Sequence, residues 1–244
     1  MKCEKHDLYY TYVCPECLKP YLKDSFFLNL EEIRQYQKSN SNKVKTMDIK
    51  KVINVICALK IKYFDKIAYA GLLLYDINHQ IVLDCKIKRF PQRFPYFSTI
   101  LFLRDLDIYL HLAKILDKDP DCYLLNASGQ LHPFLFGVAS DFGIKLKSEV
   151  PVIGITKTLL IKDVTVENFK NSEDRKIVGD IILIDKLIGK YLSSENSKKG
   201  IYISVGNNIS LNSAFKIILK MHKYRVPEPI RLLDLELKKF IGNI

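Results

Sequence analysis

Three apolar segments follow one another closely between residues 52 and 90, and they constrain the fold more than any other feature of the sequence. They read VINVICALKI, IAYAGLLLYD and IVLDCKIKRF, and each is rich in the β-branched, aromatic and aliphatic residues typical of strands. Short polar connections separate them, at residues 63–66 and 77–80. Because connections of this length join neighbouring antiparallel strands, the sequence predicts a three-stranded meander.

Beyond the meander, predicted helices and strands alternate. Residues 98–120 carry apolar residues at helical spacing, with Ser98 or Thr99 as a candidate cap and Pro120 as a stop. The segments that follow are the strand CYLLN, a helix from about Pro133 to Lys147, the strands VPVIGITK, KIVGDIILID and KGIYISVG, and a helix over residues 211–222. A meander followed by this alternation predicts an α/β fold with an RNase H-like layout, a mixed sheet flanked by helices.

The composition favours a globular chain with an affinity for polyanions. Hydrophobic residues make up 48% of the chain, which is enough to fill a core, and 38 Lys and Arg against 27 Asp and Glu give a net charge of +11. This charge attracts nucleic acids, although a lysine-rich composition alone produces it as well. The start of the sequence, MKCEKHDLYY, has no apolar signal region. We therefore expect an intracellular protein, in nucleus or cytoplasm, with no membrane partner.

A cluster of potential metal ligands lies in the first seventeen residues. Its spacing is Cys3-x2-His6-x7-Cys14-x2-Cys17, two close pairs that suit one tetrahedral ion. Three thiolates and one imidazole favour zinc over magnesium or calcium. Four protein ligands leave no open position, so the predicted zinc is structural. Ordinary thiols beside a surface histidine, or a redox CxxC pair, are the alternatives.

The sequence predicts three successive parts. Residues 1–24 form a zinc-knuckle-like module, which is also a candidate surface for a protein partner. Residues 25–47 are interpreted as a short helix and a polar linker, since Lys38 to Lys43 contain no apolar residue. Residues 48–244 form the main domain.

Several stretches of the main domain together resemble the endonuclease V family, nucleases that cut near deoxyinosine or inosine. The similar segments are, in order, FPYFSTILFLRD, DCYLLNASGQLHPFLFGVASDFGI, VPVIGITKTLL and IYISVGNNISLNSAFKIILKMHKYRVPEPIRLLD. Their order and spacing hold from about Val52 to Asp234. The resemblance implies an endonuclease V-like version of the RNase H-like fold, a role in DNA repair, and metal-assisted phosphodiester hydrolysis by clustered carboxylates.

Carried over residue by residue, the family's catalytic set is mostly substituted. The family's first-strand Asp falls on Cys57 and its central Asp on Asn126. Its Glu falls on Asp105, which keeps a carboxylate on a shorter side chain, and its His falls on Asn207. Lys157 is retained. The resemblance therefore implies a catalytically degenerate site.

Magnesium is not expected at such a site unless the ligands are rearranged. An amide offers one neutral oxygen, and a thiol suits soft metals, so neither replaces a carboxylate for Mg²⁺. Asp141, near the central loop, is the acid that would have to serve a rearranged site.

The resemblance also indicates which residues contact nucleic acid. The loop that in the family inserts beside the damaged base survives here as Pro95-Tyr96, followed by Phe97. Aromatic side chains beside basic ones suit stacking on bases next to a phosphate track, although they would equally pack the helix below. The candidate residues are Arg93, Tyr96, Phe97, Arg104, Gly129 and His132, of which His132 is also interpreted as a loop brace.

Three functions follow from these observations. The first is a nucleic-acid-binding protein on an endonuclease V-like scaffold without catalysis. The second is an active inosine-directed DNA or RNA endonuclease with a rearranged metal site. The third is a structural subunit that uses the domain as a protein-docking scaffold.

Overall fold

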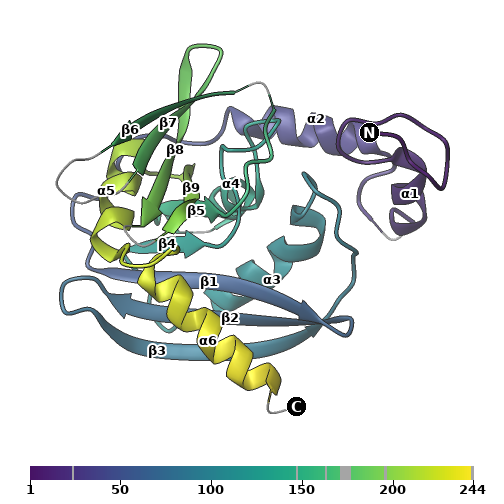
Figure 1. Ribbon diagram of the computed structural model, residues 1–244. Coiled ribbons are helices and arrows are strands. Elements are labelled where there is room, and N and C mark those ends of the chain that lie inside the picture. Colours follow the sequence, from purple (N-terminus) through teal and green to yellow (C-terminus); the bar gives the residue numbers. More distant parts are fainter. Residues whose placement is uncertain (24, 147, 163, 171–176, 195–196, 243–244) are drawn as a thin grey trace.

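The computed structural model places the chain in one nine-stranded mixed sheet with helices on both faces (Figure 1). It describes residues 1–244 except 24, 147, 163, 171–176, 195–196 and 243–244. The helices are α1 (Pro15–Leu18), α2 (Leu30–Ser41), α3 (Phe102–Lys114), α4 (Val138–Lys145), α5 (Leu211–Met221) and α6 (Glu228–Gly242), with a 3-10 turn at Lys19–Tyr21. The strands are β1 (Val55–Phe64), β2 (Ile67–Asp76), β3 (Ile81–Pro91), β4 (Cys122–Leu125), β5 (Val152–Thr156), β6 (Thr165–Lys170), β7 (Ile177–Leu183), β8 (Lys186–Ser194) and β9 (Ser197–Asn207).

The strand order explains where the chain can build a site. It is β3-β2-β1-β4-β5-β9-β8-β7-β6. The predicted meander is confirmed, since β1, β2 and β3 pair antiparallel. Strands β1, β4 and β5 are parallel to one another, and β9 returns antiparallel beside β5. The carboxyl ends of three parallel strands therefore meet at one edge of the sheet, the usual position of a binding site in α/β folds.

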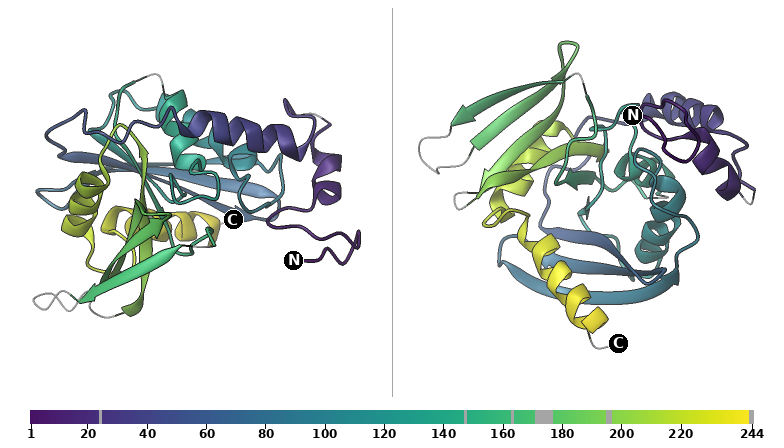
Figure 2. Two further views of the ribbon diagram at one scale, coloured as in Figure 1. Left: turned by 90° about the horizontal axis from the view of Figure 1, so that it is seen from above. Right: turned by 45° about the vertical axis from the view of Figure 1, so that its right-hand side comes forward.

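Two apolar cores lie on opposite faces of the sheet. Along β1 the side chains alternate, so that Cys57 and Leu59 face one core while Ile56 and Ala58 face the other. Figure 2 shows α2, α3 and α4 on the first face and α5 and α6 on the second. Burial on both faces accounts for the nearly continuous apolar run that begins this strand. Among the described residues, no helix has the length and apolar character needed to cross a membrane.

Two helices begin later than the sequence predicts. Neither Ser98 nor Thr99 caps α3, whose first residue is Phe102, because Thr99 takes the left-handed backbone conformation (φ 70°). The predicted helix from Pro133 begins at Val138, because Leu135 also has a positive φ of 52°. The predicted end of that helix, Lys147, lies outside the described residues.

The segment predicted as a polar linker is largely helical. Helix α2 continues to Ser41, and Gln37 on it is fully buried. The Gln37 amide donates to the carbonyl oxygens of Thr99 (2.8 Å) and Phe136 (3.2 Å), which holds this helix on the main body. The division into residues 1–24, 25–47 and 48–244 stays a prediction, and residue 24 itself lies outside the described residues.

Strands β6 and β8 were not predicted from the sequence. Strand β8 lies beside β9, on the side of the sheet away from β5. Its sequence, KLIGKYLSS, contains no long apolar run that would predict a strand. At the N-terminus, an isolated antiparallel bridge joins Lys2 and Tyr9.

Candidate functional site

The carboxyl ends of β1, β4 and β5 bring three polar residues to one edge of the sheet. Leu125 pairs with Leu59 on one side and with Gly154 on the other. The backbone N–H of Asn126 donates to the carbonyl oxygen of Leu59 (3.0 Å), so the parallel register continues and places Lys60 opposite Asn126. Lys157 directly follows β5 at the same edge.

Cys57 does not lie at this edge. It pairs with Tyr123, three residues before Asn126, which is about 10 Å along the strand. The thiol is fully buried in the apolar core, and this burial raises its pKa. The register therefore assigns the first-strand position beside Asn126 to Lys60 and not to Cys57. No local sequence signal selects Lys60, because the position follows from the pairing of β1 with the distant strand β4.

Lys60 is a buried cation tied to the C-terminal helix. Its ammonium lies 2.9 Å from the Asp234 carboxylate on α6, and Lys62 lies 3.1 Å from the same oxygen. Burial lowers the pKa of Lys60, with Asp234 acting in the opposite direction and the charges of Lys157 and Lys62 adding to the decrease. Burial alone would raise the pKa of Asp234, but its lysine partners outweigh that effect and hold it well below its ordinary value. Asp234 therefore serves as a counter-ion for lysines.

Asp105 keeps its carboxylate, but both of its oxygens already have partners. The Tyr63 hydroxyl donates to Oδ1 (2.6 Å), and Arg104 donates from Nε to Oδ1 (2.7 Å) and from Nη2 to Oδ2 (3.2 Å). The Arg104 guanidinium also stacks 3.9 Å from the centre of the Tyr63 ring. Asp105 is thus the acid of a buried, charge-paired network.

Asn207 lies at the opposite end of the parallel strands. It pairs with Val152 at the start of β5, and Val152 pairs with Tyr123 at the amino-terminal part of β4. Its side-chain oxygen accepts from the backbone N–H of Lys45 (2.8 Å), and its side-chain nitrogen donates to Gly143 O (3.0 Å). The structure therefore gives Asn207 the contacts of a clamp between chain segments.

The donor set at the carboxyl edge does not fit magnesium. Mg²⁺ requires several hard oxygen ligands, usually including carboxylates free to coordinate. Here Lys60 brings a positive charge, Asn126 one neutral oxygen, and Asp105 a carboxylate held by Arg104. Within the described part of the chain, the only group of three or more His, Cys, Asp or Glu side chains close enough to hold an ion is at the N-terminus.

Asp141 does not provide a rearranged site. It is fully buried on α4, where it accepts a hydrogen bond from the Tyr36 hydroxyl (2.7 Å) and pairs with Lys145 (3.3 Å). Burial raises the pKa of its carboxyl. These contacts tie α4 to α2.

Three of the predicted nucleic-acid contacts are exposed to solvent or line a hollow. Tyr96 is 61% exposed, and the Arg104 guanidinium lies 5.3 Å from the centre of its ring. Arg93 is exposed, and together with Arg104 and His111 it lines a hollow of about 200 Å³ beside α3. This arrangement offers an aromatic face next to two permanent positive charges.

The other predicted contacts are engaged within the protein. Phe97 packs against Tyr21, with ring centres 5.9 Å apart. His132 is 2% exposed and braces the loop, because its Nε2 donates to Thr99 O (2.8 Å) while Nδ1 accepts from Phe134 N (3.2 Å). A Cβ on Gly129 would lie 2.0 Å from the backbone oxygen of Val205, so only glycine fits there.

The cavity behind the central loop is nearly filled. Its walls are formed by Gln37, Thr99, Leu101, Phe102, Ser128, His132, Gly137, Val138 and Leu160, and its volume is about 10 Å³. A space of that size holds about one water molecule. A purine base does not fit into it without movement of the walls.

The N-terminal cysteines and histidine are gathered as the spacing predicts. The ligand atoms of Cys3, His6, Cys14 and Cys17 all lie within 4.8 Å of one another. His6 Nδ1 is 3.3 Å from Cys17 Sγ, 3.6 Å from Cys3 Sγ and 3.7 Å from Cys14 Sγ. Ligands about 2.1–2.3 Å from a tetrahedral zinc are about 3.4–3.8 Å apart, so this cluster fits that ion.

The close contacts within the cluster shift the pKa values of Cys3 and Cys17 in opposite directions. Burial alone raises the pKa of Cys3, but its contacts with His6 and the other thiols lower it to about 6. The contact with Cys3 raises the pKa of Cys17 to about 11. A divalent ion removes the repulsion that keeps the thiols from ionising together.

Comparison with known proteins identifies relatives of the main body. The Endonuclease V family model matches residues 35–235. The endonuclease V of Dictyoglomus thermophilum is 31% identical over 219 residues, covering 88% of this chain and 92% of that protein. The solved Bacillus subtilis endonuclease V superposes with a TM-score of 0.75 and 27% identity, covering 87% of this chain and 93% of that one.

A structure of Ciona intestinalis endonuclease V in complex with a 24mer DNA containing an inosine followed by a ribo-adenosine has the same fold. Its TM-score is 0.74 at 19% identity, over 88% of this chain and 98% of that one. These matches confirm the endonuclease V-like fold. They also confirm the family resemblance, although the cysteine cluster precedes the matched residues. The chain belongs to the endonuclease V family.

Proposed function

We propose that this protein binds nucleic acid through its endonuclease V-like surface and does not cut it. The observation that carries the proposal is Lys60. It occupies the first-strand position beside Asn126, where metal-assisted hydrolysis needs a carboxylate. A buried ammonium at this position repels a divalent cation instead of coordinating it.

The charge balance of the edge supports the same conclusion. The cations Lys60, Lys62, Lys157, Arg104 and Lys238 lie on or beside it, against the two carboxylates of Asp105 and Asp234. This excess attracts a phosphate backbone without a bridging metal. The net charge of +11 over the whole chain acts in the same direction.

The proposed contact surface consists of the exposed Tyr96 and Arg93, with the largely buried Arg104 beside the Tyr96 ring. Stacking of a base on an exposed tyrosine beside an arginine tolerates any sequence, because every base has a π-face. The small volume behind the central loop makes insertion of a hypoxanthine base costly. We infer that the protein binds single-stranded DNA or RNA with little preference for inosine.

Zinc is the cofactor that we propose for the N-terminal cluster. Its role is structural, since all four coordination positions are taken by Cys3, His6, Cys14 and Cys17. Metal analysis of the purified full-length protein tests this point. One equivalent of zinc, lost in a Cys14→Ser variant, supports it, and a chain that folds equally well without metal contradicts it.

A titration of fluorescein-labelled single strands in EDTA and in Mg²⁺ tests the proposed function. We expect the dissociation constant to be the same in the two buffers apart from the effect of ionic strength. Lys157→Ala removes one exposed cation from the edge and should weaken binding of all sequences alike, while Lys186→Ala, an exposed lysine on β8, serves as the matched control. Binding that requires Mg²⁺ would contradict the proposal.

A further inference from the structure

The N-terminal module adds no positive charge to the protein. Residues 1–24 contain four lysines, at positions 2, 5, 19 and 23, and four acidic residues, at positions 4, 7, 16 and 24. The formal charge of this part is therefore zero, so the whole excess of +11 resides in residues 25–244. An electrostatic extension of the nucleic-acid surface does not explain the module.

Several of its contacts with the rest of the protein instead meet at one loop, Phe94–Thr99, while Lys162 lies 6.0 Å from the centre of the Tyr12 ring. The Tyr21 ring packs against both Phe94 and Phe97, with each pair of ring centres 5.9 Å apart. The Ser98 hydroxyl donates to the backbone carbonyl of Tyr12 (3.4 Å). Tyr96 lies in this loop, and it points outward with 61% of its surface exposed.

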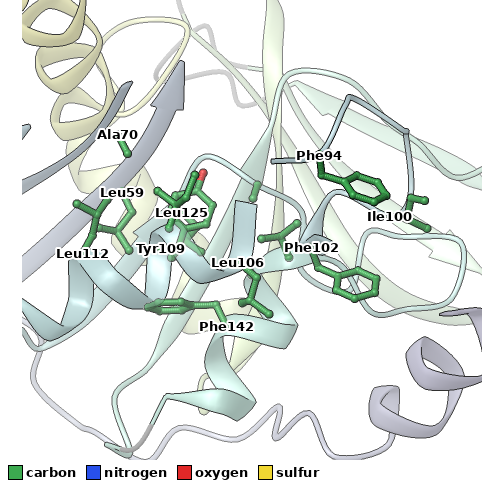
Figure 3. Close-up of a cluster of buried hydrophobic side chains, with 14 of the residues drawn as sticks. Leu59, Ala70, Phe94, Ile100, Phe102, Leu106, Tyr109, Leu112, Leu125 and Phe142 are labelled. Carbon is green, nitrogen blue, oxygen red and sulfur yellow. The ribbon is translucent and has the colours of Figure 1, made fainter. Parts of the chain in front are cut away.

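Buried side chains join the module to the same region of the core. Val13, Leu18 and Leu22 belong to the apolar cluster that includes Phe94 and Phe102. Figure 3 shows Phe94, Ile100 and Phe102 at the end of this cluster that lies away from Leu112 and Ala70. The module thus closes the end of the core from which the loop emerges.

The loop needs this support because its backbone is strained. Thr99 is a β-branched residue at φ 70°, in the left-handed region that such residues rarely adopt. Its carbonyl accepts hydrogen bonds from Gln37 and His132, both 2.8 Å long, which hold the loop from one side. On the other side of the loop, the Tyr21 ring packs against Phe94 and Phe97, and the Tyr12 carbonyl accepts a hydrogen bond from Ser98.

The module has little regular structure of its own. Its regular structure consists of four residues of α1, a 3-10 turn and the Lys2–Tyr9 bridge. So small a unit depends on its metal for folding. Tyr21 lies four residues after the ligand Cys17, on the turn that continues α1, so the ligand cluster fixes where its ring lies.

We propose that metal bound by Cys3, His6, Cys14 and Cys17 fixes the Phe94–Thr99 loop through Tyr21, and thereby positions Tyr96. Loss of the metal releases the Tyr21 ring, and the strained loop then relaxes. The effect on nucleic-acid affinity rests on the proposed function, whereas the effect on the loop itself does not.

Hydrogen exchange of the full-length protein, followed by mass spectrometry, tests the proposal directly. Peptides covering residues 92–101 are compared in the zinc-loaded protein, after removal of zinc with a chelator, and after zinc is added back. We expect exchange in the loop to rise about tenfold or more without zinc and to return with it, while strand β1 stays protected. Unchanged exchange in the loop after zinc is lost, or absence of bound zinc, would overturn the proposal.

A pair of variants distinguishes loss of the Tyr21 contacts with the loop from unfolding of the whole N-terminal module. Tyr21→Ala should keep one equivalent of zinc and still expose the loop to exchange, because it removes only the ring contacts. Tyr9→Ala changes an exposed tyrosine of the same module (83% exposed) and should leave both zinc and loop unchanged. If the loop is equally protected from exchange in Tyr21→Ala and Tyr9→Ala, the Tyr21 ring does not hold the loop and the proposal fails.

Nucleic-acid affinity is measured on the same samples. If Tyr21→Ala raises exchange in the loop and weakens binding as Tyr96→Ala does, both the support of the loop by Tyr21 and the proposed function hold. If exchange in the loop rises but binding is unchanged, Tyr21 supports the loop as proposed, but the role proposed for Tyr96 in binding fails.

Discussion

The Lys60 ammonium lies 2.9 Å from the carboxylate of Asp234, so strand β1 and helix α6 are joined by a buried ion pair at the carboxyl edge of the sheet. Figure 1 shows α6 lying across the strands of the meander. Asp234 also contacts Lys62 and Lys238. Where metal-assisted hydrolysis requires negative charge, this protein has a lysine whose charge is balanced from another element.

Restoring two carboxylates should create a metal site. The double variant Lys60→Asp with Asn126→Asp removes one positive charge and places two acids on neighbouring strands. We expect it to bind about one equivalent of Mn²⁺ more than the parent, measured by calorimetry or by electron paramagnetic resonance.

The matched control is Cys57→Asp with Asn126→Asp. Cys57 is fully buried three residues from the edge, so this pair should gain no manganese and should be destabilised by the buried charge. Manganese bound by the Cys57 pair and not by the Lys60 pair would show that the register argument is wrong.

Tyr96→Ala should weaken binding of single-stranded nucleic acid about 5- to 160-fold, since stacking on one aromatic residue contributes about 1–3 kcal/mol. Tyr224→Ala is a close control, because Tyr224 is also exposed (52%) and has an arginine, Arg231, 4.7 Å from its ring centre. Fluorescence anisotropy compares the two. Equal losses in both variants would remove the case for a specific stacking residue.

Arg93→Ala should weaken binding of every sequence to a similar degree. Because an exposed arginine acts on phosphates, the slope of log affinity against log salt concentration should fall by about one. Titrations at several salt concentrations measure this slope. An affinity loss confined to one sequence would indicate contact with a base.

Asn207→Ala should lower stability and leave binding unchanged. The variant leaves the Lys45 N–H and the Gly143 carbonyl without their partner, which costs about 1–3 kcal/mol. Denaturant titration and anisotropy measure the two quantities, with Asn78→Ala in an exposed turn as the control. A large loss of binding in a stable Asn207→Ala protein would contradict the role of a clamp.

The stability of the protein should fall as the pH is lowered from 6.5 to 4. Burial lowers the pKa of His132 from 6.5 to about 4, so in this range the unfolded chain takes up a proton that the folded chain does not. The pKa shift contributes about 3 kcal/mol to the free energy of unfolding. This contribution is present in full above pH 6.5 and is lost as the pH approaches 4.

Denaturation midpoints between pH 4 and 7 measure this dependence. His132→Gln should flatten it, whereas His79→Gln, at an exposed site, should not. A parent protein whose midpoint is constant over this range would show that His132 is not a buried neutral imidazole.

The parts predicted correctly from the sequence are those set by local pattern. Strand β2 has the bounds expected from IAYAGLLLYD, because both of its faces are buried and its connections are short. Helix α5 likewise begins at Leu211 as expected, since Ser210 caps it through the Ser213 N–H.

The parts that were missed depend on pairing between distant segments. Lys60 emerges as a site residue only when the register of β1 against β4 is known, and motif alignment placed that position on Cys57. The contact of Tyr21 with Phe94 joins residues 73 positions apart, and no local pattern encodes it. Thr99 was expected to cap a helix, but tertiary hydrogen bonds hold it in the left-handed conformation.

The most direct test of the central claim is incubation of the purified protein with end-labelled, inosine-containing single-stranded RNA and DNA. The reactions contain Mg²⁺, Mn²⁺ or EDTA, and an Asp105→Ala variant is run beside the parent. We expect the strand to be shifted on a native gel and to remain uncut under all three conditions. Cleavage near the inosine that requires metal and disappears in Asp105→Ala would show that the carboxyl edge of the sheet is still an active site.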